Sequence, residues 1–323
     1  MYRILKIYAP GIAGLVAVGI AAFAALWNLL LGDRPVELRS SGVVTWWTVL
    51  CAVGVFNVFA WQRTAVLVTR WSATADASVW RFQRWQLLLS AVFVLGCAFR
   101  SLFPRADVQR IGLIDSWLSS VLVGRSVATV AELCFMAQWA LLLHGAAKEI
   151  GSRFAVAISL VIVPLIAIAE VCSWTAVLTT CYIGNVVEES IWALSGSLLV
   201  IGCIVVWSHC RAARRPFLAA ALVLGTMYVT FMCTVDIPMY VSRWQADEAG
   251  GRAYLTLSQG LDDAWSRRVV TFSWEEWQTE IPWMTLYFSV AVWCSLALVH
   301  APRLSPGRSA IRPGMLAEGH LSA

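Results

Sequence analysis

The sequence predicts an all-α bundle of transmembrane helices, a polytopic membrane protein in one helical domain over residues 1–301. Of its 323 residues, 59% are hydrophobic and only 13% are charged, and the mean hydropathy is +0.72. A soluble domain carries about 25% charged residues. A run of about 20 apolar residues crosses the hydrocarbon core of a bilayer, and the chain contains about eight such runs.

The predicted spans are separated by short polar connections, apart from two longer ones, before the third span and before the last. In order they are Ile12–Leu31, Val43–Trp61, Trp85–Phe103, Leu118–Leu143, Phe154–Leu178, Ser190–Trp207, Phe217–Tyr240 and Met284–His300. The first run lacks a convincing small-x-small cleavage site, so we expect a retained helix and not a removed signal peptide.

The distribution of lysine and arginine predicts the orientation, because short loops rich in these residues stay in the cytoplasm. They concentrate at the N-terminus, in every second loop and in the tail: Arg3, Lys6, Arg63, Arg70, Arg81, Arg84, Lys148, Arg153, Arg211, Arg214, Arg215, Arg303, Arg308 and Arg312. Both termini are therefore expected in the cytoplasm. The membrane is expected to be the inner membrane of the cell. Residues 302–323, rich in Pro, Gly, Ser and Arg, are expected to form a disordered cytoplasmic tail.

Ionisable side chains inside the spans are the strongest functional signal. Arg125 and Glu132 are seven residues apart on the fourth span, so they share one helix face to within about 20°. A charge in the bilayer centre costs several kcal/mol and must face a protein interior or a wet cavity. Glu170, Glu188 and Asp236 lie on later spans at similar depth, in the outer half. The pattern predicts a polar pocket that opens outward.

The chemistry of these residue types suggests two sets of roles. The candidate catalytic residues are the buried carboxylates, which can act as general acid or base or hold a divalent cation through oxygen ligands: Glu132, Glu170, Glu188 and Asp236. The candidate substrate-binding residues are two arginines suited to an anionic group and two tryptophans deep in the spans: Arg100, Arg125, Trp174 and Trp192. The expected ligand is an anionic small molecule or a lipid headgroup, which the pocket binds and can transform.

Three other interpretations of the same residues stay open. The carboxylates suit a transporter or channel that carries protons or cations. A non-catalytic assembly or sensory subunit also fits the composition. Arg125 could simply pair with Glu170 and hold two helices in register, because buried ion pairs are costly to break even where they add little stability.

Several classes of protein are not predicted. His144, His209 and His300 lie at cytoplasmic span ends, without the spacing of a haem or zinc site, so no cofactor and no metal ligand are assigned. Lys6 and Lys148 are the only lysines, and neither lies in a late span as a retinal Schiff base requires. The net charge of +5 is explained by cytoplasmic arginines, so nucleic-acid binding is not expected.

Two features of the outer face leave alternatives. The long connection 242–282 ends in TFSWEEWQTEIPW, which alternates aromatic and acidic residues. It is expected either to lie across the outer mouth as a lid or to form a solvated interfacial turn. Most cysteines stand singly in apolar runs and act as small hydrophobic residues. A disulfide between Cys172 and Cys181, both near the oxidising face, is an open alternative.

Overall fold

The computed structural model describes residues 42–71 and 77–301, except residue 211. The predicted span Ile12–Leu31 and the predicted disordered tail, residues 302–323, lie outside the described residues. Within them the chain is mostly helical, with three two-residue strands. The all-α fold class is confirmed for this part of the chain.

Seven helices in the described ranges are long and apolar enough to cross a membrane. Five are single helices: α3 (Gly42–Trp71), α4 (Ala77–Leu102), α5 (Val121–Ile150), α6 (Arg153–Thr179) and α7 (Ile183–Trp207). The other two contain a π-helical turn: α8 (Arg215–Phe231), η3 (Met232–Asp236) and α9 (Ile237–Ala249), then α12 (Ile281–Leu286), η4 (Tyr287–Ala291) and α13 (Val292–Val299). The chain is a multi-pass membrane protein.

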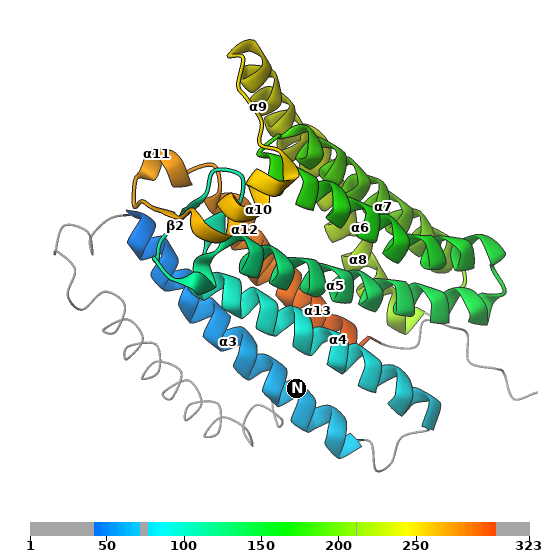
Figure 1. Cartoon of the computed structure of the whole chain (residues 1–323). Coiled ribbons are helices and arrows are strands. Elements are labelled where there is room, and N and C mark those ends of the chain that lie inside the picture. The colour runs from blue at the N-terminus through cyan, green and yellow to red at the C-terminus, as the bar shows by residue number, and fades with distance from the viewer. Residues whose placement is uncertain (1–41, 72–76, 211, 302–323) are drawn as a thin grey trace, which may run out of the picture.

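Consecutive helices are neighbours in the bundle (Figure 1). The helices α3 to α8 pack each against the next, and α13 returns to lie against α3, α4 and α5. Neighbours run in opposite directions, so one end of the bundle holds the first residues of α3, α5 and α7. We call this the outer end, following the orientation that the loop charges predict.

The surface of the bundle is apolar where a soluble protein would be polar. Large hydrophobic side chains stand exposed along the helices, among them Val49, Phe56, Leu95, Val130, Leu160 and Val171. Exposed apolar patches of this kind mark a surface that meets lipid or another partner. The interior, by contrast, buries polar and charged side chains among two apolar clusters, one around Trp47, Phe93 and Trp277 and the other around Met136, Ile162 and Leu218.

Several helices extend well past their predicted spans, two of them at the outer end. The helix α7 begins at Ile183 and not at Ser190, so Asn185 and Glu188 belong to its first turns. The helix α9 continues to Ala249 and projects beyond the bundle (Figure 1). Hydropathy locates the segment inside the hydrocarbon core, whereas helical hydrogen bonding continues into the polar interface wherever nothing breaks it.

The long outer connection is folded. It contains α10 (Leu257–Ser266), β3 (Val269–Val270) and α11 (Trp274–Trp277). The strand β3 pairs in parallel with β2 (Ile111–Gly112), which pairs antiparallel with β1 (Arg105–Ala106). Thr256 and Gln259 form a capping box that starts α10, and this helix packs against α5 and α6. Closure of this segment as a lid stays a prediction.

Two short helices complete the described chain, η1 (Trp117–Ser119) before α5 and η2 (Ala212–Arg214) before α8. All nine cysteines fall within the described residues, and each is a free thiol. Cys172 and Cys181 are therefore not joined in this structure. Both are partly buried in the outer half, Cys172 inside α6 and Cys181 in the turn that leads into α7.

Candidate functional site

The helix α5 presents three polar side chains to the interior of the outer half. Ser120 caps the N-terminus of α5 through its side chain, which accepts a hydrogen bond from the Val123 amide. Arg125, Thr129 and Glu132 then follow at intervals of four and three residues, the spacing that places side chains on one helical face. Arg125 and Glu132 are both buried, with exposed fractions of 7% and 6%.

Three carboxylates from three helices meet on one guanidinium nitrogen. Arg125 Nη2 lies 2.8 Å from Glu170 Oε2 on α6 and 3.0 Å from Glu188 Oε1 on α7. The same nitrogen lies 3.5 Å from Glu132 Oε2 on α5 itself. We call Arg125, Glu132, Glu170 and Glu188 the glutamate cluster. Its members join α5, α6 and α7 at one depth.

Neutral side chains hold each carboxylate in place. The Thr129 hydroxyl donates to Glu170 Oε2 at 2.6 Å and in turn accepts a hydrogen bond from Trp174 Nε1 at 3.0 Å. Asn185 Nδ2 donates to Glu188 Oε2 at 3.0 Å. The Tyr287 hydroxyl, from η4, donates to Glu132 Oε1 at 3.0 Å. A fourth helix therefore contacts the cluster, and the carboxylates are positioned from several sides.

The charges of the cluster do not balance. Three carboxylates against one guanidinium leave two negative charges if all are ionised, in side chains that are each less than one-tenth exposed. An uncompensated buried charge costs several kcal/mol. The cluster therefore has a strong tendency to acquire positive charge, as protons on the glutamates or as a bound cation.

Several atoms at the cluster have no hydrogen-bond partner among the described residues. Glu170 Oε1 and Asn185 Oδ1 are buried acceptors without a donor, and Arg125 Nε is a buried donor without an acceptor. Buried polar atoms are nearly always satisfied in native proteins, so such atoms are places where a further donor, acceptor, water or ion can bind. Two of these three atoms are oxygens of the type that coordinates hard cations.

The spacing of the carboxylate oxygens suits a metal ion. One oxygen from each of Glu132, Glu170 and Glu188 lies within 4.8 Å of the other two. Oxygen ligands of Ca²⁺ lie at about 2.3–2.6 Å, so two opposite ligands are about 4.6–5.2 Å apart. The three glutamates could thus coordinate an ion of this size with little movement. The guanidinium of Arg125 now stands among them.

Of the remaining predicted site residues, Trp174 joins the cluster through Thr129, and three lie apart from it. Arg100 is buried between aromatic rings, with its guanidinium carbon 5.9 Å from the Trp283 ring centre and 5.7 Å from that of Phe288. It forms no ion pair within the described residues. Trp192 packs against the apolar cluster around Met136 and Ile162. Neither Arg100 nor Trp192 has a hydrogen bond or ion pair with the glutamate cluster among the described residues, and their role in binding a ligand stays a prediction.

Asp236 lies on the far side of α7, in the π-helical turn η3, and is buried. Its carboxylate is close enough to those of Glu188 and Glu280 for electrostatic repulsion. Glu280 is buried at the start of α12 and is held by Arg243 at 3.0 Å and by Trp283 Nε1 at 2.7 Å. Carboxylates thus extend from the glutamate cluster towards the outer loops.

Sequence reasoning missed three participants. Glu280 lies in the aromatic and acidic segment before the last predicted span, and Tyr287 is an aromatic residue inside that span, so neither carries a signal of its own. Asn185 lies just before the predicted span Ser190–Trp207, because the helix starts earlier than hydropathy indicates, and the sequence predicts no role for it. The acidic partner of Asn185, three residues later on the same helix, is the one hint that could have indicated its role.

A second buried polar network ties α4, α5 and α13 together on another side of α5. Gln86 and Gln138 each donate from Nε2 to the backbone carbonyl of the other, at 2.8 and 3.0 Å. The Ser295 hydroxyl donates to Gln138 Oε1 at 2.6 Å. These contacts are neutral and reciprocal, so they lock helices together and offer no charge for chemistry.

Comparison with known protein families, with curated proteins and with solved structures finds no match for this chain.

Proposed function

We propose that this membrane protein transports a cation, either a divalent metal ion or protons, and that the glutamate cluster is its cation site. The observation that supports this most directly is the convergence of three buried carboxylates on one nitrogen of Arg125. An arginine engaged by three carboxylates is poorly placed to hold an anionic substrate. The geometry therefore favours a cationic ligand here over the anionic one that the sequence first suggests.

Arg125 would act as a tethered cation that fills the site when no ion is bound. A single nitrogen of its five-donor fork carries all three ion pairs, and Arg125 Nε is unsatisfied. A divalent ion or protons entering from the outer end would neutralise the glutamates and release the guanidinium. The guanidinium of Arg125 would compete with the transported cation for the same carboxylates. This competition lets the site capture the cation and still release it.

The surroundings of the cluster support access from the outer end. Asp236 and Glu280 add two buried carboxylates, and Arg243 pairs with Glu280 and leaves Asp236 without an ion pair among the described residues. Towards the opposite end, the second apolar cluster, around Met136, Ile162 and Leu218, fills the space among α5, α6 and α8. A carrier closed on one side and polar on the other corresponds to one of the two states that alternating access requires.

Proteoliposomes test this proposal. The full-length protein is reconstituted in neutral lipid with an internal fluorescent indicator for Mn²⁺, Ca²⁺ or protons, and the cation is added outside. We expect uptake of at least one of these cations and a rate about tenfold lower in Glu170→Gln, which keeps the shape of a ligand but removes its charge. Thermal unfolding of each variant checks that the fold is kept.

The matched control is Glu149→Gln, the same chemical change at an exposed glutamate near the inner end of α5. Its uptake rate should equal that of the unmodified protein. Uptake of protons alone would identify the transported cation as H⁺ and keep the proposal. The absence of any cation flux from a folded protein, or equal rates in Glu170→Gln and Glu149→Gln, would reject it.

A further inference from the structure

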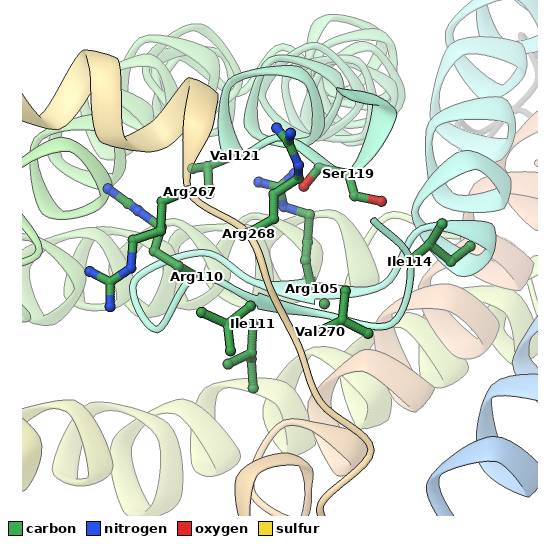
Figure 2. A pocket seen from close by; sticks show the side chains of 11 residues that line it. Arg105, Arg110, Ile111, Ile114, Ser119, Val121, Arg267, Arg268 and Val270 are labelled. Atoms are coloured by element: carbon green, nitrogen blue, oxygen red, sulfur yellow. The ribbon is translucent and has the colours of Figure 1, made fainter. Parts of the chain in front are cut away.

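Four arginines from three segments gather at a small recess on the outer end, apart from the glutamate cluster. Arg105 and Arg110 come from β1 and the turn before β2, and Arg267 and Arg268 come from the connection between α10 and β3. Ser119, at the end of η1, also lines it. Figure 2 shows these side chains around the recess, with the connection that carries Arg267 and Arg268 crossing over it. We call this group the arginine recess.

Positive charge is in excess there. Three aspartates pair with the four arginines, at 2.7 Å (Asp107 with Arg105), 2.8 and 3.8 Å (Asp263 with Arg110 and Arg267) and 3.2 Å (Asp115 with Arg268). Four guanidinium groups against three carboxylates leave one positive charge. The Asp115 side chain is 75% exposed, so its pairing with Arg268 is screened by water and weak.

The buried part of the recess has unsatisfied polar atoms. Arg105 is only 2% exposed, and its Nη2 has no hydrogen-bond partner among the described residues. Ser119 Oγ, 7% exposed, likewise has none. Burial lowers the pKa of Arg105 to about 10, with Asp107 opposing the shift and Arg100 and Arg110 adding to it. The Nη2 group of Arg105 and the hydroxyl of Ser119 are thus two neighbouring buried donors, and neither has an acceptor among the described residues.

The backbone around Arg105 preserves this geometry. Its Nη1 donates to the carbonyl oxygens of Ser119 and Ser120, at the start of α5. A Cβ at Gly124 would lie 2.9 Å from both Cδ and Nη1 of Arg105, so only glycine leaves room for the guanidinium across the first turn of α5. Helix N-termini carry partial positive charge. Because the Arg105 guanidinium lies at the first turn of α5, the partial charge of this helix end is a second positive contribution that favours an anion in the recess.

We propose that the arginine recess binds a phosphate group, either of a free phosphate compound or of an anionic lipid headgroup at the outer surface. Guanidinium groups bind phosphate oxygens through paired, charge-assisted hydrogen bonds. Arg105 and Ser119 provide the fixed inner donors. The side chains of Arg267 and Arg268 are 60% and 27% exposed and can move to admit and then clamp the ligand.

The recess shares no lining residue with the glutamate cluster, so the two proposals can fail separately. The recess now has room for about one water molecule. Binding a phosphate group therefore requires Arg267 and Arg268 to swing outward. Both residues lie on a connection at the surface, where such movement costs little.

The experiment measures binding to the full-length protein in a neutral detergent at fixed ionic strength. Inorganic phosphate and glycerol 1-phosphate are titrated by calorimetry, and retention of phosphatidylglycerol over phosphatidylcholine is measured by native mass spectrometry after nanodisc release. We expect Arg267→Gln and Arg268→Gln each to weaken binding about tenfold, the loss of one charge-assisted contact. Binding of the soluble compounds or of phosphatidylglycerol alone would identify which source supplies the phosphate.

Arg252→Gln is the matched control, because Arg252 is an outer-end arginine that pairs with Asp247 and does not line the recess. It should bind phosphate and phosphatidylglycerol as tightly as the unmodified protein. Two results would overturn the proposal. One is no binding of any of these ligands by folded protein, and the other is equal weakening by Arg252→Gln and Arg268→Gln, which would indicate attraction by overall charge alone.

Discussion

Replacing Arg125 with methionine should lower the free energy of unfolding by about 3–5 kcal/mol, the usual effect of removing one partner from a buried ion pair. Methionine fills a similar volume, so the loss reports charge and not an empty space. Glu132, Glu170 and Glu188 would then face one another with no positive group among them. Chemical denaturation of the purified protein in detergent, followed by tryptophan fluorescence, measures this change.

Two further variants separate charge from packing. Adding Glu170→Gln and Glu188→Gln to Arg125→Met removes two of the three unpaired carboxylates and should restore most of the lost stability. Arg243→Met removes a guanidinium that pairs with the single carboxylate of Glu280, which also accepts a hydrogen bond from Trp283. It should cost less, about 1–2 kcal/mol. Failure of the triple variant to recover would mean that Arg125 matters through its packing.

Helical periodicity and depth were enough to predict part of the cluster. The seven-residue spacing of Arg125 and Glu132 indicates a shared face, and span boundaries give the depth of Glu170, so an Arg125–Glu170 pair follows as one interpretation. What depth does not give is the rotation of each helix about its own axis. Arg100 has a suitable depth, yet its face of α4 turns towards Trp283 and Phe288.

Irregular backbone explains why the directions of the Asp236 and Tyr287 side chains could not be predicted from helical periodicity. Asp236 lies at the end of the π-helical turn η3, where the wider winding changes the direction of every later side chain relative to a regular α-helix. Periodicity at 100° per residue cannot anticipate such a turn. Tyr287 is likewise in a π-helical turn, η4, and contacts Glu132 from there. Both irregular turns occur where a helix passes the charged residues of the bundle.

The outer connection was the hardest part to predict because its order comes from distant partners. The strand β3 is two residues long and gains its hydrogen bonds from β2, more than 150 residues earlier in the chain. Arg110, in the turn before β2, bonds Asp263 on α10 across a similar separation. Local sequence carries no signal for contacts of this kind. The arginine recess depends on the same contacts, so no local motif identifies it.

Replacing Gly184 with valine should cost about 3 kcal/mol of stability, at the upper end of the usual effect of overpacking, and should also weaken cation uptake. A Cβ at Gly184 would lie 2.7 Å from both the Ala176 Cβ and the Cys172 carbonyl oxygen, closer than real Cβ contacts. The backbone of α6 cannot yield as a flexible side chain can, so α6 and α7 must separate. Unfolding in detergent and the proteoliposome assay measure the two effects.

The loss of uptake follows from the position of Gly184 one helical turn before Glu188, on the face of α7 that meets α6. Separation of α6 and α7 lengthens both the Arg125–Glu170 contact and the Arg125–Glu188 contact. A substitution of one carboxylate, by contrast, affects only one of these contacts. The control is Gly145→Val on α5, where an added Cβ meets nothing within 4 Å. Its stability should change by less than about 0.5 kcal/mol. If both valine variants unfold alike, the close approach of α6 and α7 does not hold the glutamates together.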